Sequence, residues 1–143
     1  MVRALLLLYD VLLISLALED IKFRKIRNLY VAEILILAAC SIAVIPEITL
    51  CSRMIGMFAV SVPMGLVATI KPGSFGGGDI KLTFACGAFL GMEFLAAGTA
   101  IAIFLAGTYC LWLICIKKVR ANKQFALGPF LSVGYIIAAY KLL

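Results

Sequence analysis

Residues 94–116 read FLAAGTAIAIFLAGTYCLWLICI, a run of 23 residues without a charged side chain. A membrane-spanning helix needs about 20 mainly apolar residues, so this run alone is long enough to cross a bilayer. Its small residues include Gly98, Gly107 and the pair Ala102 and Ala106, and such residues let helix backbones approach closely in lipid. The run therefore predicts a transmembrane helix that packs against neighbouring helices.

Apolar runs also fill most of the remaining chain. With 94–116 they number six, and the other five are 4–18, 29–46, 54–70, 82–91 and 126–142. The chain is 65% hydrophobic and 14% charged, with a mean hydropathy of +1.17, which excludes a soluble protein. We expect an all-α polytopic membrane protein, a bundle of about six transmembrane helices forming one domain over residues 1–143. The fourth run is short, and Gly91-Met92-Glu93 offers the turn before the fifth.

The net charge of +6 comes from basic residues in short clusters between the apolar runs. This placement argues against a nucleic-acid partner and for membrane orientation. Ten of the thirteen basic residues fall in the first, third and fifth loops: Lys22, Arg24, Lys25, Arg27, Lys71, Lys81, Lys117, Lys118, Arg120 and Lys123. Only Arg3, Arg53 and Lys141 remain for the other side. The positive-inside rule then predicts a multi-pass protein of a prokaryotic plasma membrane, with these loops in the cytoplasm and both termini outside.

The residue types present narrow the possible chemistry. The chain contains no histidine, which excludes Ser-His and Cys-His nucleophiles and the commonest zinc ligand. Its five cysteines lie in or at the edges of apolar runs without a C-x-x-C pair, as expected of packing residues. We therefore expect no metal and no cofactor, and any catalysis falls to carboxylates.

Two aspartates lie at the ends of apolar runs on the same expected side of the membrane. Asp20 ends the first run and Asp79 opens the fourth. A charged carboxylate near hydrocarbon is costly, so its presence there indicates function. Two carboxyls at one site resist double ionisation and share a proton, so one takes a proton from water while the other donates to the carbonyl oxygen under attack. This is the pattern of an aspartic protease.

The segment before Asp79 is rich in glycine, KPGSFGGG at residues 71–78. Gly76, Gly77 and Gly78 permit positive φ and close approach of another chain, which would suit an extended substrate beside Asp79. A phosphate-binding loop is the competing interpretation, but the segment lacks the Gly-Lys-Ser/Thr ending of such loops.

Three segments together resemble the type IV prepilin peptidases. Gly76-x-Gly78-Asp79, followed by Ile80-Lys81-Leu82, resembles the family's G-x-G-D segment. Asp20 with the basic loop that ends at Asn28 is similar to its first catalytic segment, and residues 125–130 (FALGPF) to its final Gly-Pro segment. The resemblance implies that Asp20 and Asp79 are catalytic in an intramembrane aspartyl endopeptidase. Such an enzyme cleaves the basic leader from prepilins or pseudopilins at the cytoplasmic membrane boundary.

The chain also departs from the family pattern. Bifunctional members carry paired cysteines for zinc between the first two helices and methylate the new N-terminus, whereas this loop has no cysteine. We therefore expect a peptidase without N-methyltransferase activity, like the short enzymes of tight-adherence (Flp) pili. Archaeal preflagellin peptidases share the same chemistry, so both bacterial and archaeal systems remain open.

Other polar residues receive secondary roles. Glu19 points about 100° away from Asp20 on a helix, and we expect it to contact the basic loop or to recognise the charge of the leader. Lys81 either steadies the site or reaches lipid phosphates. Asp10 is expected to be a packing residue, and Glu33 to pair with the first loop. The basic loops themselves are expected to bind anionic lipid rather than the basic leader.

Two alternatives use the same acids differently. A small transporter or channel subunit would bind an ion or relay protons through paired carboxylates. A non-catalytic assembly subunit would pair them with Arg24 or Lys81 and would tolerate Asp→Asn changes. Either aspartate fits the role of general base, the site fits preassembly as well as assembly by substrate, and several oligomeric states are compatible with this sequence.

Overall fold

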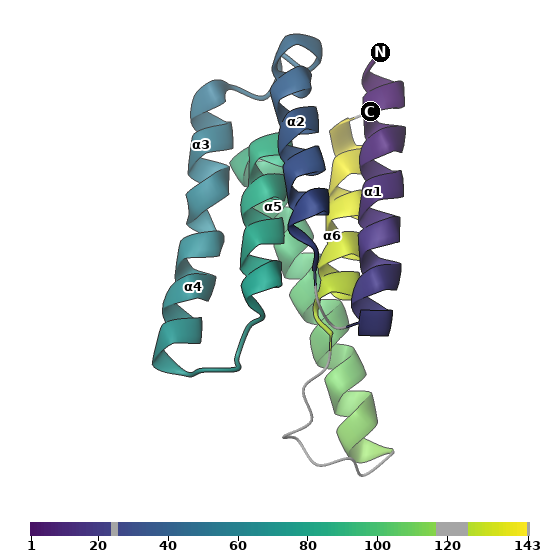
Figure 1. Ribbon diagram of the computed structural model, residues 1–143, viewed down its shortest axis with the longest axis vertical. Helices are drawn as coiled ribbons and strands as arrows, with labels where there is room; N and C mark the ends of the chain where they lie inside the picture. The colour runs from purple at the N-terminus through teal and green to yellow at the C-terminus, as the bar shows by residue number, and fades with distance from the viewer. Residues whose placement is uncertain (24–25, 117–125, 143) are drawn as a thin grey trace.

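The computed structural model describes residues 1–23, 26–116 and 126–142, and within these ranges it is helical with no strand. The all-α prediction is confirmed. Figure 1 shows the helices as an elongated bundle with both termini at one end. In chain order they are α1 (Val2–Phe23), α2 (Asn28–Val44), α3 (Leu50–Ala59), α4 (Ser61–Ile70), α5 (Gly77–Cys115) and α6 (Gly128–Ala139), followed by the 3-10 turn η1 (Tyr140–Leu142).

Two stretches of the described chain are long and apolar enough to cross a membrane by length and composition. They are Leu50–Ile70, which joins α3 and α4, and Gly77–Cys115, which is α5. α2 and α6 are apolar but shorter. The number of long helices is thus lower than the six that we expected, because runs 82–91 and 94–116 both belong to α5 and run 54–70 is divided between α3 and α4.

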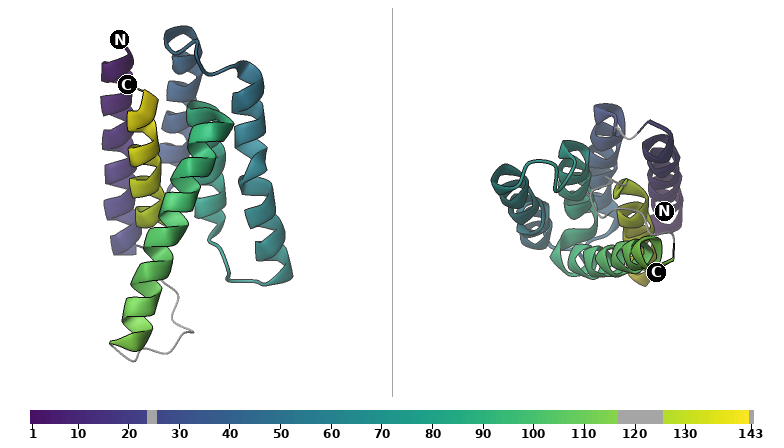
Figure 2. Two further views of the ribbon diagram at one scale, coloured as in Figure 1. Left: turned by 180° about the vertical axis from the view of Figure 1, so that it is seen from behind. Right: turned by 90° about the horizontal axis from the view of Figure 1, so that it is seen from below.

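α5 reverses direction at Gly91. This residue has φ 72° and ψ 177°, which no helix contains, and the two arms of α5 run back alongside each other in Figures 1 and 2. A positive φ favours glycine, and a Cβ at Gly91 would also lie 2.6 Å from Cγ2 of Ile48. The N–H of Met92 donates to Oγ of Ser52 at 3.0 Å, which satisfies one donor that the reversal frees. The predicted turn at this position is confirmed.

A proline accounts for the division between α3 and α4. Pro63 has no N–H to donate to the carbonyl of Ala59, four residues earlier, so the helical hydrogen-bond ladder is interrupted there. The chain departs from the regular helix at Val60, where φ is −105°.

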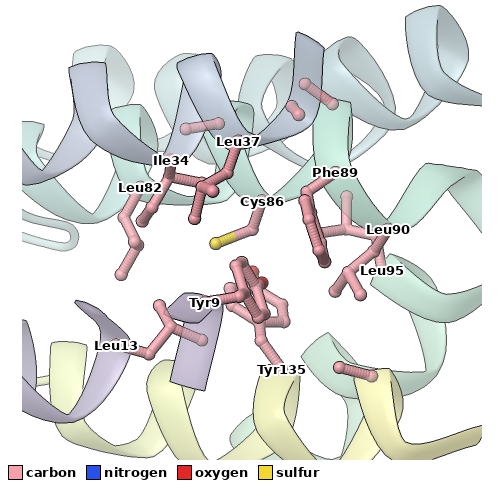
Figure 3. Close-up of a cluster of buried hydrophobic side chains, with 14 of the residues drawn as sticks. Tyr9, Leu13, Ile34, Leu37, Leu82, Cys86, Phe89, Leu90, Leu95 and Tyr135 are labelled. Atoms are coloured by element: carbon pink, nitrogen blue, oxygen red, sulfur yellow. The ribbon is translucent and has the colours of Figure 1, made fainter. Parts of the chain in front are cut away.

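α5 is the centre of the bundle and packs against α2, α3 and α6, while α1 packs on α2 and α6. Figure 3 shows the core where these helices meet. The rings of Tyr9 and Phe89 stack there with centroids 4.2 Å apart, and Leu82, Cys86 and Tyr135 are fully buried beside them.

Glycines at the contact points let two pairs of helical segments approach backbone to backbone. A Cβ at Gly87 would lie 2.8 Å from the backbone nitrogen of Met57, so α3 and the first arm of α5 meet backbone to backbone. A Cβ at Gly98 would lie 2.9 Å from the carbonyl oxygen of Gly134, so α6 and the second arm meet in the same way. Gly107, which we also expected to serve packing, has no such neighbour within 4 Å.

Arg53, one of the three basic residues left for the outer side of the membrane, is buried, with an exposed fraction of only 3%. Its guanidinium donates to carbonyl oxygens at the ends of two helical segments and to Oγ of Ser41, at distances of 2.6–3.3 Å. The carbonyl acceptors are those of Ser41, Ile45, Ile48, Ala88 and Phe89. The C-terminal end of a helix carries partial negative charge and unpaired carbonyls, so Arg53 satisfies the ends of α2 and of the first arm of α5.

Candidate active site

Asp20 and Asp79 lie at the end of the bundle opposite the termini, where α1 ends and α5 begins (Figure 1). Both are buried, with exposed fractions of 5% and 9%. Their carboxyl groups are close enough to interact electrostatically. The structure therefore brings together the two acids that the sequence singles out, although α2, α3 and α4 separate them along the chain.

The first turn of α5 fixes Asp79. It is the third residue of the helix, and its Oδ2 accepts a hydrogen bond from the N–H of Gly76 at 3.3 Å. Its own N–H donates to the carbonyl of Gly76 at 3.0 Å. A carboxylate at a helix N-terminus is favoured by the free N–H groups and by the helix dipole. The Asp79 side chain is thus held at the N-terminal end of α5.

The start of α6 holds Asp20. The backbone of Gly128 lies directly against the Asp20 carboxyl group. A Cβ at Gly128 would collide with Oδ2 of Asp20, so only glycine permits this approach. Pro129 follows at a position of the first helical turn where its missing N–H leaves no hydrogen bond unmade.

Gly128 is a site residue that the sequence analysis did not assign. The resemblance pointed to the segment around it but gave it no role. The available signal is a Gly-Pro pair just before an apolar run, since such a pair begins a helix and leaves free N–H groups.

The glycines before Asp79 act differently from our expectation. None of the three has positive φ, which among the described glycines occurs at Gly73 and Gly91. Gly77 and Gly78 already belong to the first turn of α5, so only Gly76 remains outside the helix. A Cβ at Gly78 would lie 2.8 Å from Cβ of Ile26, whereas Gly77 has nothing within 4 Å. Close approach is thus needed at Gly78, and the neighbour is the segment between α1 and α2.

Lys81 and Glu19 both contact residues at the beginning of α2. Nζ of Lys81 donates to Oδ1 of Asn28 at 3.1 Å, so Lys81 joins the G-x-G-D segment to the end of the first loop. The two roles that we expected for Lys81, steadying the site and reaching lipid phosphates, stay predictions. Nη1 of Arg27 lies 3.4 Å from Oε1 of Glu19, which is the contact to the basic loop expected for Glu19.

Neither aspartate forms an ion pair with Lys or Arg within the ranges that the structure describes. The pairing with Lys81 that a scaffold protein would use is therefore not made, and Arg24 lies outside the described residues. Asp10 lies near Tyr140, toward the other end of the bundle, and is not part of the pair. Glu33 has no ion pair in the described part of the chain.

The described residues offer no group of three or more His, Cys, Asp or Glu side chains suited to a metal. The arrangement is a pair of buried carboxyls, each lying against the backbone at the beginning of a helix. Carboxyls placed together in this way resist double ionisation and hold one proton between them. Such a pair supports general acid and general base chemistry at one point.

Residues 7–111, which include both aspartates, match the Type IV leader peptidase family. The chain belongs to this family. The family is membrane-embedded, in agreement with the apolar helices described above. The resemblance noted in the sequence is thereby confirmed.

Two curated relatives of the leader peptidase family are similar over most of this chain. One is the prepilin leader peptidase/N-methyltransferase of Bacillus subtilis, 28% identical over 127 residues that make up 89% of this chain and 51% of the relative. The other is the prepilin leader peptidase/N-methyltransferase of Vibrio cholerae, 28% identical over 136 residues, 92% of this chain and 53% of the relative. The chain spans about half the length of both relatives. No solved structure matches it significantly.

Proposed function

We propose that the chain is an intramembrane aspartyl endopeptidase that removes the basic leader from prepilins or pseudopilins. The observation that carries this proposal is the pair of buried carboxyls, Asp20 and Asp79, brought together from two helices in a chain of the leader peptidase family. Leader cleavage is also the activity named for both curated relatives.

The proposed reaction uses only water and the two aspartates. The ionised carboxylate takes a proton from water as the water oxygen attacks the scissile carbonyl carbon. The protonated partner donates to the developing oxyanion, and the bond from carbon to nitrogen breaks as the leaving amine gains a proton. The N–H of Gly76 and the close backbone of Gly128 hold the carboxylates in place while the proton is exchanged.

The alternatives receive less support. A scaffold protein would neutralise the acids with basic side chains, and Lys81 is instead bonded to Asn28. An ion-binding transporter or channel subunit explains the pair of acids but not the match to a peptidase family.

The proposed location of the site is the cytoplasmic face of a multi-pass protein in a prokaryotic plasma membrane. Its support is the charge pattern, because the segments at the end of the bundle that holds the aspartates carry Lys22, Arg27, Lys71 and Lys81. These side chains would also bind anionic lipid headgroups. Glu19, partly buried beside Asp20, is the proposed acceptor for positive charge on the leader.

We propose peptidase activity without N-methylation of the product. The support is the loop between α1 and α2, which contains no cysteine for the zinc site of bifunctional enzymes. The mature product from a cleavage reaction therefore tests both activities at once, since methylation adds about 14 Da to its N-terminus.

The test is co-expression with a tagged candidate prepilin, following leader loss by gel mobility and the new N-terminus by mass spectrometry. Wild type should yield the mature, unmethylated product. The control is a double variant with both Asp20→Asn and Asp79→Asn at matched protein levels, which should leave the prepilin intact. Absence of processing across a panel of prepilins, with the chain shown to be expressed and folded, would overturn the proposal. Proton or cation flux through reconstituted vesicles would then favour the transporter.

Replacing Gly128 with alanine is expected to lower the cleavage rate about 100-fold, because a displacement of about 1 Å at a catalytic group has an effect of that order. The added Cβ would collide with the Asp20 carboxyl and push it away from Asp79. Initial rates of leader removal at matched enzyme levels measure the effect.

The matched control is Gly77→Ala, since nothing lies within 4 Å of a Cβ there. We expect it to cleave at nearly the wild-type rate. Equal rates for the two alanine variants would contradict the role assigned to Gly128.

A further inference from the structure

Three hydroxyl groups meet in the core above the two aspartates. The hydroxyl of Tyr135 on α6 donates to Oγ1 of Thr83 on the first arm of α5 at 3.1 Å. It also lies 3.3 Å from Oγ1 of Thr99 on the second arm. Tyr135 and Thr83 are fully buried, and Thr99 nearly so. Figure 3 shows Tyr135 among the apolar side chains of the core, close to Tyr9 and Cys86.

The helical spacing connects this cluster to the site. Tyr135 lies seven residues after Gly128, two turns along the same side of α6. Thr83 lies four residues after Asp79, one turn along the same side of α5. The same side of α6 therefore contacts Asp20 at Gly128 and, two turns later, contacts the first arm of α5 at Tyr135. That arm carries Asp79. The Tyr135 hydroxyl is within electrostatic range of the Asp79 carboxyl itself.

From this arrangement we propose that Tyr135 is a positioning residue, whose hydrogen bond to Thr83 fixes α6 against the first arm of α5 and so sets Asp20 relative to Asp79. The inference rests on the proposed peptidase function. Tyr135 touches neither the substrate nor the carboxyl oxygens in this assignment. Its effect reaches Asp20 through the Gly128 backbone packed against that carboxyl, and Asp79 through one turn of α5.

The choice of residues supports a positioning role. Apolar contacts in lipid allow helices to slide, because lipid tails are as apolar as the side chains they replace. A hydrogen bond between helices has one preferred register. The close approach of Gly98 and Gly134 already brings α6 against the second arm. The bond from Tyr135 to Thr83 joins the same helix to the first arm. Thr83 also contacts Sδ of Met64 at 3.8 Å, which ties α4 to the same point.

The test is a double-mutant cycle with Tyr135→Phe, Thr83→Val and the double variant, assayed on the purified chain in detergent with a prepilin that it cleaves. Phenylalanine keeps the ring in the core and removes only the hydroxyl. We expect each single variant to lower kcat about tenfold and to leave KM unchanged. The double variant should be no slower than either single variant, since both remove the same bond. Thr83→Ser, which keeps the hydroxyl, should restore the wild-type kcat.

Two controls remove hydroxyls elsewhere. Thr108→Val removes a hydroxyl whose hydrogen bond in the described part of the chain goes to the carbonyl of Phe104 in its own helix. Tyr109→Phe removes a hydroxyl from an exposed ring. Both should keep the wild-type kcat. Thermal unfolding midpoints separate positioning from stability, because a purely structural role would lower the midpoint and leave the kcat of the folded fraction unchanged.

Wild-type kcat in Tyr135→Phe, additive losses in the double variant, or a Thr83→Ser variant as slow as Thr83→Val would each overturn the inference. If Tyr135→Phe does not fold, the comparison of Thr83→Val with Thr83→Ser decides the matter alone. Failure of the proposed function is a separate result, since it appears as a wild-type chain that cleaves no prepilin.

Discussion

Asparagine at either Asp20 or Asp79 is expected to lower the rate of leader cleavage by about 1,000-fold or more, within the range that general acid and base groups contribute. Asparagine keeps the size of the side chain and removes the proton that the reaction must exchange. The two carboxyls act as one unit across a shared proton, so each single variant should be nearly as slow as the double variant. Initial rates with purified protein and a cleavable prepilin measure these losses over the required range.

A matched control for these variants is Asp10→Asn. Asp10 is also a buried aspartate of α1, but it lies near Tyr140, toward the opposite end of the bundle. We expect this variant to retain most of the wild-type activity. If either Asp20→Asn or Asp79→Asn cleaves at more than a tenth of the wild-type rate, that aspartate is not catalytic and the mechanism fails.

Replacing Arg53 with methionine is expected to destabilise the folded protein by about 3–5 kcal/mol, since several buried carbonyls lose charge-assisted hydrogen bonds at once. Methionine fills a similar volume but donates no hydrogen bond. The ends of α2 and of the first arm of α5 would then be left with unsatisfied acceptors beside the reversal at Gly91. Unfolding in mixed detergent micelles, followed by circular dichroism, measures the change.

Arg3→Met is the control for this prediction, because Arg3 is exposed and the substitution removes the same charge. It should leave the free energy of unfolding within about 0.5 kcal/mol of the wild-type value, as is usual for surface substitutions. Arg53→Lys keeps the charge, but one ammonium group cannot reach carbonyls at both helix ends, so we expect an intermediate loss. An Arg53→Met variant as stable as Arg3→Met would contradict the role assigned to Arg53.

Several features follow from the sequence because they depend on local composition. Long uncharged runs such as 94–116 require helices in an apolar medium, since an unpaired backbone group in lipid is costly. The reversal at Gly91 was also predictable, because Gly91-Met92-Glu93 interrupts two apolar runs. Asp20 and Asp79 were identified as a candidate pair because a carboxylate at the edge of a hydrophobic helix is expensive and so marks function.

Some local sequence patterns did not predict even the local backbone conformation. Three successive glycines suggested positive φ before Asp79, yet Gly77 and Gly78 begin α5 with helical geometry. Glycine permits unusual backbone conformations without requiring them. Position 78 requires glycine because Ile26, from another segment, approaches it closely. The sequence of residues 71–78 alone does not indicate this contact.

By itself the sequence determined the helical class and the apolar character of the bundle, and it singled out the two aspartates as candidates. Each of these follows from the chemistry of residues close together in the chain. Only the tertiary structure decided that Gly128 holds Asp20, that Tyr135 bonds Thr83, and that Arg53 is buried among carbonyls. These contacts join helices whose relative rotation and height are set by the packing of the whole bundle. Side chains on different helices meet only when those two quantities are fixed, and neither can be derived from the sequence of one helix.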